Sequence, residues 1–195
     1  MSEIDCAIAI RPLLGNISDC GDTGRIIKCD GRYFLALVDV LGHGAEARRV
    51  AVSAEKYLDS HFGSELLSVM EGLQRCLTGT RGAVAALFFF DPETEEYAYT
   101  GIGNITVRIF GYKPASLIPK DGIVGFGSVR TKLVTGKLSR GDTLLMHSDG
   151  IKEHFDVLDC AGLFAKDARE IADGILAKFG KKSDDASCIV FKYLK

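Results

Sequence analysis

The chain has 195 residues, 47% of them hydrophobic and 26% charged, which is the composition of an ordinary globular protein. Its formal net charge is −2 and it has no basic block, so binding to nucleic acid or to an anionic membrane is not expected. The longest apolar run, residues 83–90, is too short to cross a bilayer, and the N-terminus lacks the positive region of a signal peptide. Six scattered cysteines without a C-x-x-C pair favour reduced thiols over a zinc site or a disulfide scaffold. We therefore expect one cytoplasmic domain over residues 1–195.

Apolar runs and turn residues predict a strand-rich chain. An Asp30-Gly31 turn between two such runs predicts a hairpin of residues 25–29 and 33–39, and the polar, glycine-containing segment 12–24 before it is expected to be a loop. A long segment with two prolines and four glycines, 111–127, is expected to be a second loop with short extended pieces. The other strands are expected at residues 4–10, 83–90, 96–100, 105–110, 129–135, 143–147 and 186–192.

Three segments carry apolar residues at helical spacing, so each is expected to bury one face against a sheet. Ser64 is placed to cap the second helix, and Gly180 to end the third. Helices grouped apart from strand-rich segments indicate an α+β domain of mostly antiparallel sheet. The three apolar stripes are Ala47, Val50, Ala51, Ala54 and Leu58; Leu66, Val69, Met70, Leu73 and Leu77; and Ala168, Ile171, Ala172, Ile175 and Phe179.

The segment FLALVDVLGHG, residues 34–44, combines a buried strand with a charged end. Its first five residues are apolar, as in a strand that is covered on both faces. Asp39 follows directly, and a carboxylate at the end of a buried strand is costly unless a cation or hydrogen-bond donor meets it. Gly42-His43-Gly44 then forms a permissive turn before the first helix. This arrangement suits a metal or phosphate site.

Other acids occupy similar positions. Asp22 follows a glycine, Asp149 lies in Ser-Asp-Gly after an apolar strand, and Asp184-Asp185 precede the last strand. Any one of them is also explained by an Asp-Gly hairpin turn or a Ser-Asp helix cap. Together, however, carboxylates repel and raise each other's pKa, and hard cations such as Mg²⁺ or Mn²⁺ relieve this because they prefer oxygen ligands. The residues themselves therefore predict a carboxylate-bound metal site that acts on phosphate or water.

Four segments keep a fixed order along the chain: Asp22, DVLGHG (39–44), SDGIKE (148–153) and DDASCIV (184–190). In this order they resemble the successive motifs of the PPM-type (protein phosphatase 2C-like) metal-dependent serine/threonine phosphatases. The resemblance implies a four-layer α-β-β-α sandwich of two mostly antiparallel sheets flanked by helices. It also implies hydrolysis of phosphoserine or phosphothreonine by a metal-activated water.

Two intervening segments, GIGNITVRI (101–109) and PASLIPKDGIVGFG (114–127), resemble the middle of the bacterial branch of this family, typified by SpoIIE and the RsbU-like stress phosphatases. The resemblance covers almost the whole chain. In its small size the chain is most similar to feedback phosphatases of the RsbX type, which act on the stressosome. The implied partner is a phosphorylated STAS-domain protein of a bacterial stress-signalling pathway, and the loops at 11–24 and 111–128 are expected to form the walls of its binding site.

The resemblance assigns the metal ligands by position and implies two Mn²⁺ or Mg²⁺ ions. Asp39 would bridge both ions, and Asp149 and Asp184 would complete the shell of one. The backbone carbonyl of Val40 and the carboxylate of Asp22, partly through water, would hold the other. These ions would activate water without a covalent enzyme intermediate, so no cysteine or serine nucleophile is required.

The chain departs from the family pattern at three places. Val40 stands where glycine usually follows the first metal-binding Asp, a change that a backbone carbonyl ligand tolerates. Leu41 occupies the position of the candidate general acid of non-bacterial members, and His43, two residues on, is the alternative general acid or a residue that makes structural hydrogen bonds in the turn. The phosphate-binding arginine is not identifiable, although Arg11 and Arg25 are near the N-terminus.

Two other functions are compatible with parts of this pattern. A pseudophosphatase would bind a phosphoprotein without hydrolysing it, and loss of a metal-binding aspartate would indicate this, but all the expected aspartates are present. A GHKL-type ATP-binding kinase also has an Asp before a glycine-rich turn. Its glycine box follows a helix, however, whereas a hairpin is expected before residue 40 here. The sequence therefore favours a phosphatase.

Overall fold

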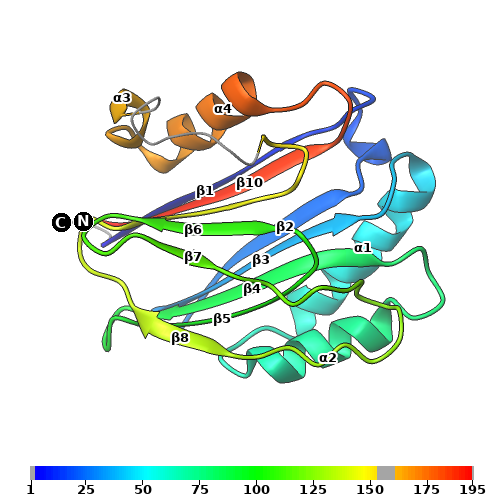
Figure 1. The fold of residues 1–195 in the computed structure, drawn as a ribbon, viewed down its shortest axis with the longest axis horizontal. Helices are drawn as coiled ribbons and strands as arrows, with labels where there is room; N and C mark the ends of the chain where they lie inside the picture. The colour runs from blue at the N-terminus through cyan, green and yellow to red at the C-terminus, as the bar shows by residue number, and fades with distance from the viewer. Residues whose placement is uncertain (1–2, 153–160, 195) are drawn as a thin grey trace.

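The computed structural model describes residues 3–152 and 161–194, and these form four layers (Figure 1). Two five-stranded sheets pack face to face, with helices on the outer face of each. The strands are β1 (Ile4–Arg11), β2 (Asp22–Cys29), β3 (Arg32–Val40), β4 (Ala83–Asp91), β5 (Glu96–Ile102), β6 (Thr106–Phe110), β7 (Ala115–Leu117), β8 (Val134–Lys137), β9 (Thr143–His147) and β10 (Ala186–Tyr193). The helices are α1 (Ala45–Ser60), α2 (Leu66–Cys76), α3 (Ala161–Phe164) and α4 (Ala168–Phe179), with a short 3₁₀ helix, η1, at Ile17–Asp19.

The first sheet has the strand order β1-β10-β9-β6-β7, and the second has the order β2-β3-β4-β5-β8. All pairings between these strands are antiparallel. Helices α1 and α2 cover the second sheet, and α4 covers the first (Figure 1). The predicted α-β-β-α sandwich is therefore confirmed. No helix in the described part of the chain is long and apolar enough to cross a membrane.

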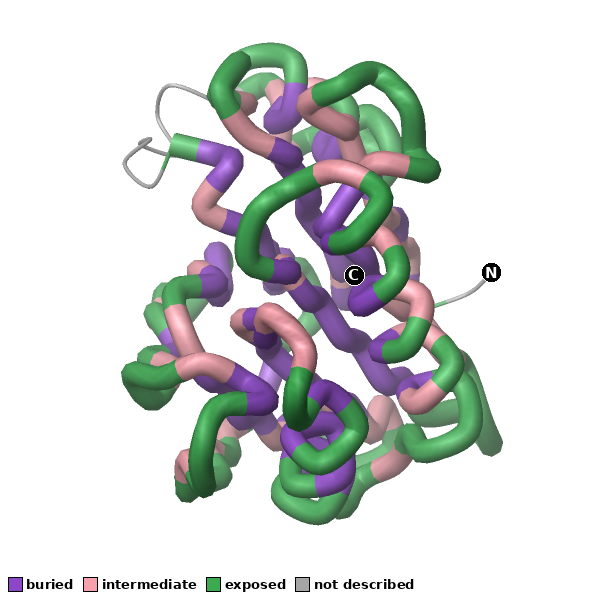
Figure 2. The backbone as a smooth tube through the Cα atoms, turned by 90° about the vertical axis from the view of Figure 1, so that its right-hand side faces the viewer, coloured by how far each residue is buried: buried purple, intermediate pink, exposed green. Residues whose placement is uncertain are grey.

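Strand β3 shows why its apolar run is continuous. Tyr33, Leu35 and Leu37 point into the core between the two sheets. Alternate residues Phe34, Ala36 and Val38 point to the helix side of the same sheet. Because successive side chains of a strand point to opposite faces, a strand that is covered on both faces needs apolar residues throughout. Figure 2 shows that the buried residues lie mainly in the middle of the molecule, whereas its outer turns are exposed.

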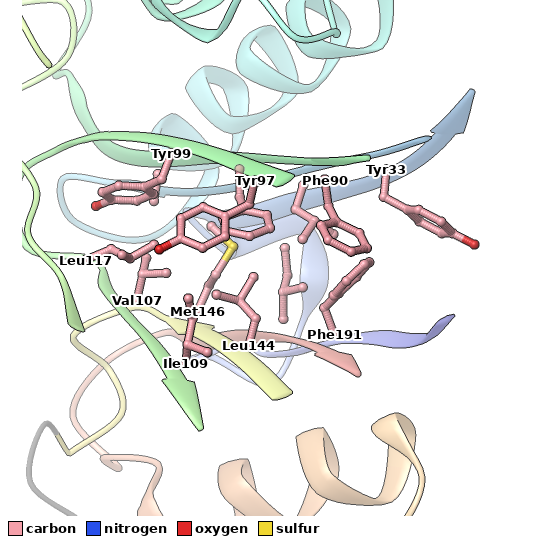
Figure 3. Packing of buried hydrophobic residues seen from close by; sticks show 14 of the residues in the cluster. Tyr33, Phe90, Tyr97, Tyr99, Val107, Ile109, Leu117, Leu144, Met146 and Phe191 are labelled. Carbon is pink, nitrogen blue, oxygen red and sulfur yellow. The ribbon is translucent and has the colours of Figure 1, made fainter. Parts of the chain in front are cut away.

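Aromatic side chains fill much of the space between the sheets (Figure 3). Phe90 of the second sheet meets Phe191 of the first edge to face, with ring centroids 5.6 Å apart, and Tyr33 meets the same ring at 5.4 Å. Leu144 and Met146 of β9 lie on the opposite side from the second sheet's aromatic residues (Figure 3). This packing fixes how the two sheets face each other, and therefore where their edges meet.

The predicted helical stripes are confirmed for α1 and α2, and nearly so for α4. Every residue of the α1 and α2 stripes is buried, and in α4 only Phe179 is partly exposed. Gly180 ends α4 as expected. The expected cap of α2 is wrong, because the helix begins after Glu65 without a side-chain cap hydrogen bond. Asp167 caps α4 by accepting a hydrogen bond from the Glu170 N–H at 2.8 Å.

The starts of two strands differ from expectation by several residues. Strand β2 begins at Asp22 and not at residue 25, because the ladder with β3 continues through Thr23 and Gly24, which carry no large apolar side chain. The strand expected at 129–135 is instead β8, from Val134. At Val129 both backbone groups bond the amide of Gln74, at 3.1 and 3.0 Å, so a side chain replaces a neighbouring strand there.

Candidate metal centre

Asp22 and Asp39 lie side by side at the end of the second sheet. The β2–β3 register pairs them directly, so both side chains lie on the same face. Asp22 is only 1% exposed, and its Oδ2 accepts hydrogen bonds from the hydroxyls of Ser148 at 2.7 Å and Ser187 at 2.6 Å. Both serines belong to the first sheet's edge, one after β9 and the other in β10. The Asp22 carboxyl is therefore a direct polar link between the two sheets.

The environment of these two acids disfavours their charged forms. Burial raises the pKa of Asp22 to about 6, although the hydroxyls of Ser187 and Ser148 act in the opposite direction. The pKa of Asp39 is raised well above its usual value, first by burial and then by the negative charges of Asp22, Asp149 and Asp184. Every main influence on Asp39 raises its pKa, and none is a cation. The site thus concentrates negative charge that the surrounding side chains do not balance.

The other two acids join from the first sheet. Asp149 follows β9 and Asp184 precedes β10, and these strands are adjacent and antiparallel. Asn104 donates from Nδ2 to Oδ2 of Asp149 at 2.9 Å, and the backbone N–H of Asp185 donates to Oδ1 of Asp184 at 2.9 Å. Burial, and next the charge of Asp149, raises the pKa of Asp184. The structure therefore brings together all four acids that the sequence singled out from different parts of the chain.

The oxygen atoms at this edge are of the kind that bind divalent cations. The carbonyl of Val40, the residue after Asp39, lies near Gly21: a Cβ on Gly21 would be 3.1 Å from that oxygen and 2.8 Å from the carbonyl oxygen of Gly42. No three His, Cys, Asp or Glu side chains among the described residues form a ready-made site for one ion. A shared arrangement, in which backbone oxygen and water supplement the carboxylates, suits Mg²⁺ or Mn²⁺, which usually retain water ligands.

His43 and the candidate arginines have different surroundings. His43 is exposed in the turn between β3 and α1. Arg11 donates to the carbonyl of Lys181, and Arg25 forms an ion pair with Asp59 at 2.6 Å, so both have structural partners. Arg81, which the sequence analysis did not single out, lies against the glycine turn. A Cβ on Gly42 would be 2.8 Å from its Nη1, and its Nη2 donates to Glu46 at 2.9 Å.

Three residues that orient the acids were not predicted from the sequence. Ser148, Ser187 and Asn104 all hydrogen-bond to predicted ligands, yet none was expected to have a role. Ser187 is fully buried on the face of β10 that also carries Ile189 and Phe191, and a lone polar residue at an inward position is a signal that could have been followed. The segment 11–24, which was predicted to be a loop at the binding site, contains η1 and the start of β2. Glu153 of the SDGIKE motif lies outside the described residues.

A groove of about 830 Å³ opens beside Asp149. Strand β6 contributes Thr106 and Arg108 to its lining, and the segment 116–119 lines it from the second predicted wall loop. Asn104 and Lys181 also lie in its wall. The groove therefore extends away from the acids over the uncovered end of the first sheet and gives a substrate more contact surface than the acids alone.

Several known proteins share this fold. The family model of stage II sporulation protein E (SpoIIE) matches residues 29–194. A solved structure described as "The bacterial stressosome: a modular system that has been adapted to control secondary messenger signaling" is 32% identical, with a TM-score of 0.89, and the match covers 97% of this chain and 99% of that one. No curated protein matches the chain significantly.

Two further solved structures share the fold at lower identity. RsbX in complex with magnesium is 20% identical with a TM-score of 0.82, over 96% of this chain and 94% of that one. The catalytic domain of the serine/threonine phosphatase PstP with two manganese ions is 16% identical with a TM-score of 0.74, over 98% of this chain and 99% of that one. The fold and the acid cluster define a metal-dependent protein serine/threonine phosphatase of the PPM type. Within that class, the chain belongs to the SpoIIE family.

Proposed function

We propose that this phosphatase uses two Mn²⁺ or Mg²⁺ ions to dephosphorylate a serine or threonine on a STAS-domain protein of a stressosome-type assembly. The observation that carries the proposal is the meeting of four acids from both sheets at one edge, with raised pKa values at three of them and no balancing cation at Asp39. The described similarity to a stressosome structure and to RsbX supports the choice of partner.

The proposed ligands divide between the sheets. Asp39 would be shared between the two ions, Asp22 and the Val40 carbonyl would hold one from the second sheet, and Asp149 and Asp184 would hold the other from the first. When bound, two divalent cations lower the pKa of water and neutralise charge that develops on the phosphoryl oxygens. The hydrogen bonds to Asp22, Asp149 and Asp184 hold these carboxyls in place before a cation arrives, and such support is known to strengthen metal binding.

Two groups at the glycine turn after β3, the exposed His43 and the partly exposed Arg81, are candidates for contact with the phosphoserine. His43 lies in the glycine turn directly after β3, where its ring can reach solvent and donate a proton to the leaving serine oxygen. Arg81 is held at the same turn by Glu46 and offers a guanidinium for the phosphoryl oxygens, a geometry that suits bidentate contacts. We therefore assign the phosphate contact to Arg81 in preference to Arg11 or Arg25.

A folded partner fits the surface better than a small phosphomonoester does. The groove beside Asp149 is open and mixed in character, with Arg108 and Lys181 near apolar Ile118. Leu14, Ile17 and Leu41 are also exposed, in the loop before β2 and in the turn after β3. Such a surface offers contacts to a protein on both sides of the acids, and these contacts would add to recognition of the phosphorylated side chain.

The proposal is tested by comparing kcat/KM on three substrates: a phosphorylated STAS domain, the phosphopeptide cut from it, and p-nitrophenyl phosphate. Each is assayed with Mn²⁺, with Mg²⁺ and with EDTA. We expect activity only with a divalent cation and a clear preference for the intact domain. Equal kcat/KM on all three substrates would overturn the dedicated partner, and full activity in EDTA would overturn the metal mechanism. Tight binding of the phosphodomain without phosphate release would instead indicate a pseudophosphatase.

A further inference from the structure

Asp185 is a buried acid beside the metal centre that the proposed ligand set leaves unused. It is 4% exposed, and its two carboxylate oxygens accept hydrogen bonds from two different backbone groups. The N–H of Leu13 donates to Oδ1 at 2.6 Å, and the N–H of Gly21 donates to Oδ2 at 2.7 Å. The Asp185 carboxylate therefore connects the segment before β2 to the start of β10.

The bond to Gly21 changes the end of the β2–β3 ladder. Val40 donates its N–H to the carbonyl of Gly21 at 3.3 Å, and in an antiparallel ladder such a pair normally exchanges a second bond, from Gly21 N–H to Val40 carbonyl. Here the Gly21 N–H is turned to Asp185 instead. On the other side of β3, Leu41 bonds Gly82, so Val40 and Ala83 form a non-hydrogen-bonded pair, and the N–H of Ala83 faces away from β3 to the carbonyl of Val124 at 3.1 Å. The Val40 carbonyl is thus left without either cross-strand donor.

We propose that Asp185 is a positioning residue that keeps the Val40 carbonyl oxygen open to a divalent cation by holding the N–H of Gly21 away from it. This inference rests on the proposed function, because it concerns one ligand of the metal site proposed there. The absence of a side chain at Gly21 serves the same end, since a Cβ would lie 3.1 Å from the carbonyl oxygen. Asp185 also donates its own N–H to Asp184, so it orients a carboxyl on the opposite side of the centre.

The chain contains a matched control for this role. Asp142 is also 4% exposed, and its carboxylate also accepts two backbone hydrogen bonds, from Ser139 at 2.8 Å and from Tyr112 at 3.0 Å. It precedes β9, whereas the metal centre follows that strand, so Asp142 lies at the opposite end of the first sheet. Asp142→Asn therefore imposes the same chemical change on a similar loop anchor far from the acids.

The test is calorimetric titration of the metal-free protein with Mn²⁺ for wild type, Asp185→Asn and Asp142→Asn. Asparagine offers one acceptor oxygen to two N–H groups, so one donor at position 185 is released. We expect the affinity for one Mn²⁺, the ion proposed to bind the Val40 carbonyl, to fall by about 10–100-fold in Asp185→Asn, as is typical when a partner of a metal ligand is lost. Asp142→Asn should lose stability to urea without a change in either Mn²⁺ affinity. Hydrogen exchange should report faster exchange of the Gly21 amide in Asp185→Asn alone.

The possible results separate the inference from the function. Unchanged Mn²⁺ binding in Asp185→Asn, or an equal loss in Asp142→Asn, would overturn the positioning role. Loss of both ions in Asp185→Asn would also overturn it, because Asp185 would then act as a ligand itself. The selective loss of one ion would support the role even if the wild-type protein released no phosphate from a phosphoserine substrate, a result that would contradict the proposed function alone.

Discussion

Asp22 is held by two hydroxyls that both bond the same carboxylate oxygen. Ser148 and Ser187 donate to Oδ2, and Ser187 also donates its backbone N–H to the Ser148 oxygen at 3.0 Å. These bonds lower the cost of burying the charged form, but burial remains the largest influence and raises the pKa of Asp22 to about 6. The metal-free site is therefore under electrostatic strain that a bound cation would relieve.

A pH dependence of metal-free stability follows from this shift. Because the pKa of Asp22 is about 6 in the folded protein and about 3.8 when the group is unperturbed, the folded state holds its proton more tightly. The stabilising contribution is present in full below about pH 4 and is lost as the pH rises through about 6. At about 1.4 kcal/mol per pKa unit, the loss is on the order of 3 kcal/mol. Urea unfolding in EDTA between pH 4 and 7 measures it.

The control for this prediction is Asp22→Asn, which cannot titrate at that position. The free energy of unfolding of wild type minus that of the variant should fall with rising pH across this window. The negative charge of Asp22 also raises the pKa of Asp39, so Asp39→Asn should also reduce the slope. A difference that stays flat from pH 4 to 7 would contradict the raised pKa.

Substitution of the proposed ligands separates activity from stability. Asp39→Asn, Asp149→Asn and Asp184→Asn should each abolish phosphate release, since each removes a carboxylate from the shared site. In EDTA at pH 7, however, Asp39→Asn should be at least as stable as wild type, because it removes one charge from a group of like charges. Circular dichroism and urea unfolding check the fold. Near-normal turnover with unchanged Mn²⁺ affinity in any of these variants would remove that residue from the ligand set.

At the scale of elements, the sequence predicted β3 and the helices well because their signal is local. The apolar run of β3 predicts burial of both its faces, and the apolar stripe of α1 predicts burial of one face. The structure shows these same faces buried. The start of β2 and the position of β8 were not predictable in this way. Asp22 belongs to a strand because it pairs with Asp39 of β3 and accepts hydrogen bonds from two serines that are distant in sequence. Val129 does not belong to a strand because Gln74 hydrogen-bonds its backbone. The acids were found as a group, but the hydroxyls that hold them depend on the tertiary fold.

The glycine of the Ser148-Asp149-Gly150 motif is required for close packing between strand ends. A Cβ on Gly150 would lie 1.7 Å from the carbonyl oxygen of Asp185 and 2.9 Å from the Cα of Ala186. These are backbone atoms, so they cannot move aside as the end of a side chain can. The segment after β9 therefore lies directly on the start of β10, which brings Asp149 and Asp184 together.

Gly150→Ala should accordingly separate these two segments. We expect a loss of about 1–3 kcal/mol in the free energy of unfolding, the usual cost of forcing a methyl group into a packed site, together with weaker Mn²⁺ binding. Gly162→Ala is the matched control, because a Cβ at that helical position would meet nothing within 4 Å. Urea unfolding and Mn²⁺ titration measure both variants. Equal behaviour of the two would show that the close approach at Gly150 has no energetic consequence.

At the scale of the whole molecule, the two sheets are joined in two different ways. Apolar and aromatic residues fill the space between them along most of their length (Figure 3). At the acid edge, hydrogen bonds from Ser148 and Ser187 to Asp22 link the sheets, and carboxyls from both sheets lie close together, with Asp22 and Asp39 on one side and Asp149 and Asp184 on the other. Without a cation this edge contributes repulsion, so it is where we expect the metal-free sheets to separate most readily.

Binding of Mn²⁺ should therefore stabilise the whole molecule, most strongly at this edge. Ions that bind only the folded state stabilise it by about 2.7 kcal/mol at a free concentration one hundred times the Kd, so Tm should rise with Mn²⁺ concentration. Hydrogen exchange should slow at the end of β3 and the start of β10, and change little around Asp142 at the far end of β9. Asp39→Asn should lose both effects, because its carboxyl is the proposed shared ligand. A Tm that does not respond to Mn²⁺, or protection spread evenly over both sheets, would show that the cations do not join the sheets at this edge.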